Sequence, residues 1–359
     1  MDAFISGITI VAGLALVVMS LASAFRTVVM PRAAFDPVTR AIFLGFRSFF
    51  VGIAKRTRYV DHETVLGAHA PLGLLTMALA WAVGLVLGFT LLFEATGDTG
   101  LAEAAVLAGS SFTTLGFAAP ETPVHDLLSV TAAILGLFIV ALLISYLPTI
   151  YGLFSRREVT VADVNIKSGG AAHGPDLVLH LTRVADTTRL DDMWVDWGHW
   201  LITLGETHTS EPSLNFYRSP RVKRSWLTAA TAILDAAALR NTLVAAPFSI
   251  RAEMTYRSGT EALGSIAHFF FVRPDGDDEH YTLLTRDDFD AEVERLKDDG
   301  VPVVEDLDEA WTEFVKLREL YEPYVLGLCE LILPPPAPWS TDLLLRSRPE
   351  IPRRRRRRD

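Results

Sequence analysis

The chain has 359 residues, half of them hydrophobic, with a mean hydropathy of +0.28. This composition is too apolar for an ordinary soluble protein and too charged for one that lies wholly inside a bilayer. No Lys or Arg stands between Arg58 and Arg156, whereas most acidic residues follow Glu158. We therefore expect a membrane half followed by a soluble half, and we assign the net charge of -10 mainly to the latter.

Residues 4 to 25 form an uncharged run that is long enough to cross a bilayer, since roughly 20 apolar residues span its core. The start Met-Asp-Ala lacks the basic residues of a signal peptide, so we expect a retained helix. A basic segment follows, within which residues 39 to 55 are predicted to form an amphipathic helix at the membrane surface. The alternative, an additional span interrupted by Arg47, is disfavoured because a charge at mid-bilayer is costly.

Residues 71 to 93 and 127 to 154 predict a second and a third span. The segment 26 to 63 and the pair Arg156 and Arg157 are basic, whereas the loop 94 to 126 carries acidic residues and no basic one. The positive-inside rule then places the N-terminus and this loop outside a plasma (inner) membrane, and the C-terminal region in the cytoplasm.

Between the second and third spans lies the stretch Ala-Gly-Ser-Ser-Phe-Thr-Thr-Leu-Gly-Phe-Ala-Ala-Pro, residues 108 to 120. Residues 101 to 112 predict a short amphipathic helix, and the chain turns back at Pro120 and Pro123. Irregular backbone at membrane depth is tolerated only where protein buries it or where it lines a water-filled path. The order of helix, re-entrant loop and helix therefore indicates a pore.

A potassium filter replaces the hydration shell of the ion with backbone carbonyls from four Thr-Val-Gly-Tyr-Gly loops. With Thr114, Leu115, Gly116 and Phe117 at the corresponding positions, residues 71 to 157 resemble the potassium channel pore-loop family in its two-helix-plus-pore form. The resemblance implies a homotetramer of cyclic symmetry that conducts potassium. It implies a selectivity filter formed by Thr113, Thr114, Leu115, Gly116, Phe117 and Ala118. It also implies an inner helix that bends at Gly136 and Pro148.

Ala118 departs from the family pattern, because it stands where the family has its second filter glycine. An alanine at a position that favours positive φ costs about 1 kcal/mol or more, which leaves the ratio of potassium to sodium permeation open. The alternative function is a non-conducting, membrane-anchored interaction or signalling protein with a vestigial pore loop.

After Phe154 the pattern changes. Residues 158 to 166 alternate like a β-strand, and Ser168, Gly169 and Gly170 predict a hinge. Helical patterns follow at residues 175–185, 190–205, 222–243, 250–271, 286–298 and 306–333. Thr285 is the expected cap of the fifth of these helices, and Gly300 its stop.

The expected fold class is therefore α: three transmembrane helices with a re-entrant pore loop, followed by a mostly helical cytoplasmic domain. The predicted divisions are an N-terminal helix with its basic loop (1–63), a pore domain (64–157), the cytoplasmic domain (158–333) and a disordered Pro/Arg-rich tail (334–359). Arg353 to Arg358 in this tail are expected to bind anionic lipid, at about 1 kcal/mol each.

No other motif predicts chemistry. No Gly-x-Gly-x-x-Gly opens a helix, and we find no nucleophile–base arrangement, so we expect neither an enzyme nor a cofactor. A nucleic-acid partner is disfavoured because the chain is expected to be tethered to the membrane and is acidic overall. Cys329, the only cysteine, is expected to be buried on an apolar helix. The remaining polar groups are interpreted as solvated or core residues: His199 and His208 near Asp196 and Glu206, and the face of Asp191, Asp192 and Asp196. Arg221, Lys223 and Arg224 are interpreted as a surface patch, with an anionic ligand or lipid headgroups as the alternative.

Overall fold

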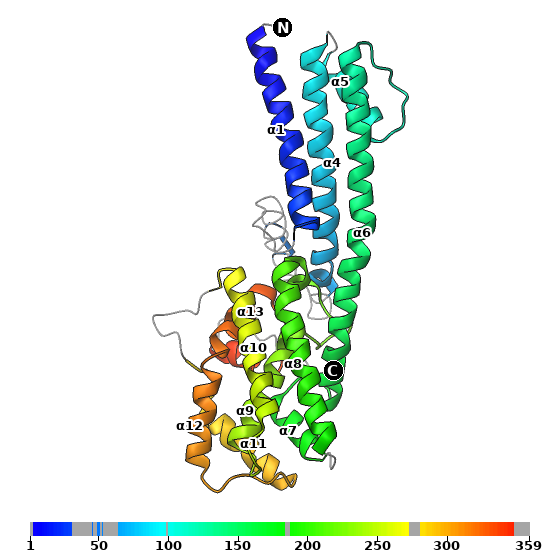
Figure 1. Ribbon diagram of the computed structural model, residues 1–359. Helices are drawn as coiled ribbons and strands as arrows, with labels where there is room; N and C mark the ends of the chain where they lie inside the picture. The colour runs from blue at the N-terminus through cyan, green and yellow to red at the C-terminus, as the bar shows by residue number, and fades with distance from the viewer. Residues whose placement is uncertain are drawn as a thin grey trace, which may run out of the picture. The chain divides into compact units, whose positions relative to one another are not determined.

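A computed structural model describes residues 3–30, 45, 49–50, 52, 64–97, 100–183, 187–272 and 281–347. The chain divides into two compact units, Met1–Gly152 (unit 1) and Leu153–Asp359 (unit 2), and the helices are labelled in Figure 1. Within the described residues all regular structure is helical, apart from one isolated antiparallel bridge between Val244 and Val303.

Unit 1 contains α1 (Ala3–Val28), α4 (His69–Thr96), α5 (Leu101–Phe112) and most of α6 (Pro123–Lys167). Three helical segments are long and apolar enough to cross a membrane, namely Phe4–Val28, Thr64–Thr96 and Pro123–Lys167. They contain the three predicted spans, which confirms the expectation of three helices of membrane-spanning length and composition. The predicted surface helix at residues 39 to 55 falls almost entirely outside the described residues.

Helices α1 and α4 pack closely because small residues face each other. A Cβ at Gly13 would lie 2.8 Å from the carbonyl oxygen of Gly88, and a Cβ at Gly88 would lie 2.9 Å from that of Gly13. Nearer the other end of the pair, the indole of Trp81 donates a hydrogen bond of 2.9 Å to the hydroxyl of Ser23. Close backbone approach at glycines and polar contacts across helices are typical of helix packing in membranes.

The strand predicted at residues 158 to 166 is wrong, because α6 continues as a helix to Lys167. Its buried residues Phe154, Arg157, Val161 and Val164 follow one another at intervals of three or four, which is the period of a helix face. The predicted hinge after it is confirmed as a turn, with positive φ at Gly169 (70°) and Gly170 (139°).

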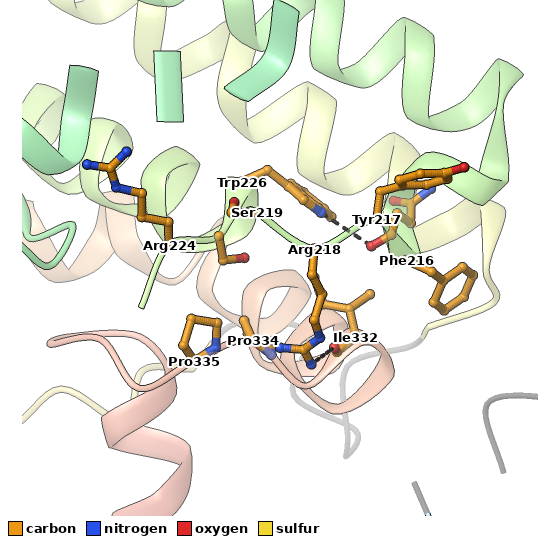
Figure 2. A pocket seen from close by; sticks show the side chains of 11 residues that line it. Phe216, Tyr217, Arg218, Ser219, Arg224, Trp226, Ile332, Pro334 and Pro335 are labelled. Atoms are coloured by element: carbon orange, nitrogen blue, oxygen red, sulfur yellow. Dashed lines mark hydrogen bonds between the residues drawn. The ribbon is translucent and has the colours of Figure 1, made fainter. Parts of the chain in front are cut away.

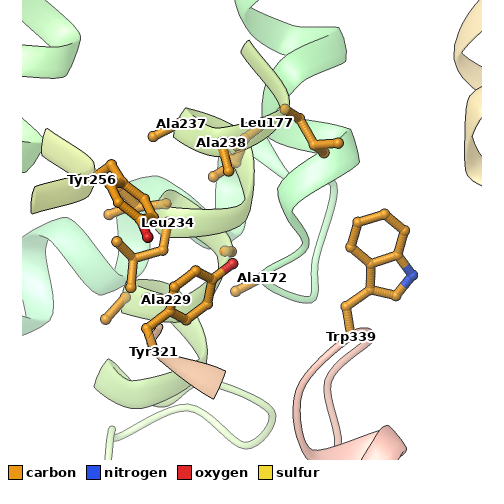
Figure 3. Close-up of a cluster of buried hydrophobic side chains, with 14 of the residues drawn as sticks. Ala172, Leu177, Ala229, Leu234, Ala237, Ala238, Tyr256, Tyr321 and Trp339 are labelled. Atoms are coloured by element: carbon orange, nitrogen blue, oxygen red, sulfur yellow. The ribbon is translucent and has the colours of Figure 1, made fainter. Parts of the chain in front are cut away.

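Unit 2 also contains α7 (Gly174–Thr182), α8 (Thr187–Ser210), the 3-10 helix η1 (Pro212–Phe216), α9 (Trp226–Thr242) and α10 (Ile250–Phe269). It ends with α11 (Arg286–Asp298), α12 (Leu307–Arg318), α13 (Glu322–Ile332) and α14 (Thr341–Ser347). Helix α9 is its centre, since every residue from Trp226 to Leu239 is buried. Figure 3 shows alanines of α9 among the side chains of this core. The apolar face of α8 faces the same core, because Trp194, Trp197, Leu201 and Leu204 are all buried.

The predicted single helix over residues 306 to 333 is two helices, α12 and α13. Pro323 lies in the first turn of α13, and the clash of a proline ring with the preceding turn disfavours a helix that continues through it. In α11 the predicted start is confirmed, because Thr285 and Asp288 form a reciprocal capping box. Gly300, with φ 84°, lies in the turn that ends this helix.

The tail was expected to be disordered from residue 334 onward, and this is wrong for residues 334 to 347. Trp339 is only 4% exposed, and Thr341 begins the short helix α14. The hydroxyl of Thr341 accepts a hydrogen bond of 2.6 Å from the N–H of Ala337. An indole that adds to the core orders the proline-rich segment around it. Arg353 to Arg358 lie outside the described residues.

Candidate functional site

The candidate site is the loop that follows α5. Helix α5 has the bounds predicted for the short helix, Leu101–Phe112, and it packs against α4. Its buried side chains are Ala104, Leu107, Ala108 and Ser110. Thr113 is the C-cap residue of this helix, so the predicted filter segment begins where the helix ends.

Five N–H groups of the loop, those of Thr113 to Gly116 and of Ala118, are directed back to the last turn of α5. A helix end leaves carbonyl groups without partners, and here the loop supplies donors to them. The backbone bonds are Thr113 to Gly109 (3.0 Å), Thr114 to Ser111 (3.0 Å), and Leu115 and Gly116 to Ser110 (3.0 and 3.4 Å). The N–H of Ala118 donates to the side-chain oxygen of Ser110 at 3.1 Å. Ser110, which is 1% exposed, therefore fixes both halves of the loop.

The carbonyl oxygens of residues 113 to 117 accept no hydrogen bond from any donor in the part of the chain that the structure describes. All five of these residues are exposed, and the side chains of Leu115 and Phe117 are 70% and 68% exposed. A peptide group usually has both its donor and its acceptor satisfied. Within the described residues, the loop therefore has all of its donors used except the N–H of Phe117, and the carbonyl oxygens of residues 113 to 117 are available to a ligand such as a cation.

Two residues of the loop have positive φ, Thr114 (59°) and Gly116 (69°). Positive φ is uncommon for residues other than glycine, so the backbone of Thr114 is a defining feature of this loop. A Cβ on Gly116 would meet no atom within 4 Å, hence its constraint is the backbone angle and not a lack of space. The positive φ expected at Ala118 is not found, and Thr114 carries the strain instead.

Gly136 lies on α6 where this helix passes the end of α5. A Cβ at Gly136 would collide with the carbonyl oxygen of Phe112, the residue just before the loop. The resemblance assigns a bending point to Gly136, and the structure adds a close contact that only glycine permits. Pro148 lies inside α6, where it removes one backbone hydrogen bond of the helix.

His125 also holds the framework around the loop, and the sequence did not single it out. Its side chain is buried, and its Nε2 lies 3.2 Å from the carbonyl oxygen of Phe93 at the end of α4. The two rings meet edge to face at 5.2 Å. The first turn of α6 is therefore attached to the last turns of α4, which brackets the loop between them.

In unit 2, Arg157 near the end of α6 is the centre of a buried polar cluster. Its guanidinium donates to the carbonyl oxygens of Leu214 (2.8 Å) and Tyr217 (2.7 Å) and pairs with Glu158 (2.8 Å). It also lies 3.2 Å from Nε2 of His208. Since Arg157 can only donate, Nε2 is the acceptor and Nδ1 carries the proton that points at the carbonyl oxygen of Leu204 (3.0 Å). Burial, together with the charge of Arg157, lowers the pKa of His208 well below its usual value.

A second buried cluster joins α9, α12 and α13. Arg318 donates to Glu322 at 2.7 Å, and it also bonds to Asp235 and to the carbonyl oxygen of Trp339. Tyr321 donates to the same carboxylate of Asp235. Each charged group is paired and hydrogen-bonded, as buried charges require. The cluster is therefore explained by its role in joining the three helices.

The polar residues of unit 2 that the sequence singles out lie as follows. The described residues contain no group of three or more His, Cys, Asp or Glu that is placed to hold a metal ion. His199, Asp191, Asp192 and Asp196 are exposed, as predicted, whereas His208 is buried. A hollow beside Arg218 holds about 20 Å³, which is room for about one water molecule (Figure 2).

No protein-family model, no curated protein and no solved structure matches the chain.

Proposed function

We propose that copies of this chain assemble into a cation-conducting pore whose narrowest part is lined by the carbonyl oxygens of residues 113 to 117. The observation that supports it is the division of roles in this loop. The N–H groups of Thr113 to Gly116 and of Ala118 bond to α5, whereas the carbonyl oxygens of residues 113 to 117 accept no hydrogen bond from the described residues. A dehydrated cation needs several such oxygens, and the loop offers them in sequence.

A single chain contributes one loop, and one loop cannot surround an ion. A closed ring of identical subunits brings the same oxygens to a common axis, and the resemblance to potassium channels makes a tetramer the proposed number. The exposure of Leu115 (70%) and Phe117 (68%) supports a partner on this surface, because apolar side chains of this size gain most from being covered.

Potassium is the proposed ion. The charge around the loop suits a cation, since Glu103, Glu121 and Asp126 are exposed and no Lys or Arg occurs between Arg58 and Arg156. Carboxylates at a pore mouth raise the local cation concentration. In the proposed orientation the loop faces the outside of the plasma (inner) membrane, and unit 2 is a cytoplasmic regulatory domain.

The test is ion flux from liposomes that contain the purified chain, with potassium and sodium compared. The variant Gly116→Val places a β-branched residue at a φ of 69° and should abolish flux. Gly7→Val is the matched control, because Gly7 lies on α1 with no atom within 4 Å of an added Cβ, and it should conduct like the unsubstituted protein.

Absence of flux from a protein whose oligomeric ring has been demonstrated would overturn the pore. It would favour the alternative, a non-conducting interaction or signalling protein. Unchanged flux in Gly116→Val would mean that this loop is not the conducting path.

A further inference from the structure

A short basic turn follows η1 in unit 2. It consists of Arg221, Val222, Lys223 and Arg224, and its ends are joined by a hydrogen bond of 3.3 Å from the N–H of Arg224 to the carbonyl oxygen of Arg221. Val222 is 50% exposed although it is apolar. Lys223 has a φ of 79°, so the turn has a defined shape. The basic turn presents one apolar side chain between three cations.

None of the three cations is paired with a carboxylate in the part of the chain that the structure describes. This is unusual within unit 2, where Arg286, Arg295 and many other surface cations are paired. Unpaired cations on a protein with a net charge of -10 indicate an anionic partner.

The segment that leads into the basic turn contacts α6 through Tyr217. Arg157 donates to the carbonyl oxygen of Tyr217 at 2.7 Å, and the rings of Phe154 and Tyr217 are 5.4 Å apart. Phe154 is the last residue of the predicted third span, and Arg156 and Arg157 follow it directly. Tyr217 therefore contacts the residue at which the predicted third span ends, and aromatic rings collect where spans meet the membrane surface.

The segment that follows the basic turn returns to the segment that precedes it. The indole of Trp226, just after the turn, donates to the carbonyl oxygen of Asn215, just before Tyr217, at 3.4 Å. The residues before and after the basic turn are therefore in contact with each other, so the turn projects as a closed loop close to Tyr217. Its cations cannot extend far from Tyr217, because only a few residues separate them from it.

The hollow beside the turn does not accept a free anion. Its volume of about 20 Å³ holds about one water molecule, and a phosphate group is larger than that. The guanidinium of Arg218 is already used, because it donates to the carbonyl oxygens of Ile332 and Leu333. In Figure 2 the guanidinium of Arg224 points away from that of Arg218. An anion that binds these cations therefore has to bind on the protein surface and not inside the hollow.

We propose that the basic turn binds the anionic headgroups of the leaflet at which α6 leaves the membrane, with Val222 inserted between them. Cations supply attraction to the surface charge, and the apolar residue supplies burial in the interface. The proposal depends on α6 crossing the membrane at residues 127 to 154, and it does not depend on whether the loop after α5 conducts.

The test uses the full chain with Val222→Cys, labelled with an environment-sensitive fluorophore. Cys329 does not compete for the label, because it is 2% exposed and burial raises the pKa of its thiol. The labelled chain is placed in phosphatidylcholine nanodiscs, and the fraction of phosphatidylglycerol is raised until the fluorescence change is complete. We expect a blue shift that phosphatidylglycerol induces and that added salt reverses.

The decisive variant replaces Arg221, Lys223 and Arg224 with glutamine in the labelled chain. Each lost cation should raise the phosphatidylglycerol fraction at the midpoint, through a binding constant that falls about fivefold per cation. The matched control replaces the exposed Arg251, Arg257 and Lys316 with glutamine and should leave the midpoint unchanged.

A midpoint that shifts equally in the two triple variants would overturn the proposal, and so would a label that stays in water at every lipid composition. A blue shift produced by inorganic phosphate in phosphatidylcholine nanodiscs would assign the turn to a soluble anion and overturn it as well. Thermal unfolding of each variant shows whether unit 2 remains folded.

Discussion

Replacing Ser110 with alanine tests the loop geometry at its anchor. The hydroxyl of Ser110 is buried and accepts the N–H of Ala118 at 3.1 Å, while the carbonyl oxygen of the same residue accepts Leu115 and Gly116. Ser110→Ala removes only the first of these bonds. A net hydrogen bond contributes about 1 kcal/mol, and an N–H left buried without a partner costs about 1–3 kcal/mol. Since 1.4 kcal/mol is a tenfold change in an equilibrium constant, the ratio of loops closed to loops open at Ala118 should fall by roughly five- to a hundredfold.

The loss is confined to the outer half of the loop, because the backbone bonds to Ser110 remain. We therefore expect lower potassium flux and a smaller potassium-to-sodium ratio, with little change in the unfolding temperature. The measurement is flux in liposomes under potassium and sodium gradients. Ser111→Ala is the control, because the hydroxyl of the half-buried Ser111 forms no hydrogen bond with the loop within the described residues. Equal flux and selectivity in the two alanine variants would refute the anchoring role of Ser110.

Three further predictions concern packing, protonation and reactivity. Gly136→Ala should reduce flux by displacing the carbonyl of Phe112, whereas unchanged flux would contradict a close contact between α5 and α6 at this position. Because the pKa of His208 is lowered in the folded state, only the unfolded state gains its proton below pH 6.5, and stability should fall there by up to about 1.4 kcal/mol per pH unit. Thermal unfolding at pH 7 and pH 5 should show less acid sensitivity in His208→Gln, and equal sensitivity would contradict this. Cys329 should react with a maleimide only after unfolding, since burial raises the pKa of its thiol, and rapid labelling of the folded chain would contradict its burial.

The long elements were predictable because their signals are physical and local. Uncharged apolar runs require a membrane or a large core, and the cap at Thr285 and the stop at Gly300 act within a few residues. The short helix before the loop was predicted with its observed bounds, because an apolar periodic segment ended at Thr113.

The wrong predictions share a cause: the structure of these segments depends on burial against residues that are distant in the sequence. Residues 158 to 166 alternate like a strand, but Val161 and Val164 are buried on one face of α6 by the rest of unit 2. The proline-rich segment after Leu333 looks disordered locally, and Trp339 orders it through the core. In the same way no local rule distinguishes Ser110 from Ser111, because only the turn of the chain brings Ala118 back to one of them.

The measurement that tests the central claim most directly is the potassium flux of mixed assemblies. Unsubstituted chains and Gly116→Val chains are combined before reconstitution, and flux is measured against the fraction of variant. If four copies line one path and one defective loop closes it, an equal mixture should retain about one sixteenth of the flux. A linear fall, with half of the flux remaining, would contradict a shared pore built from the loop of several chains.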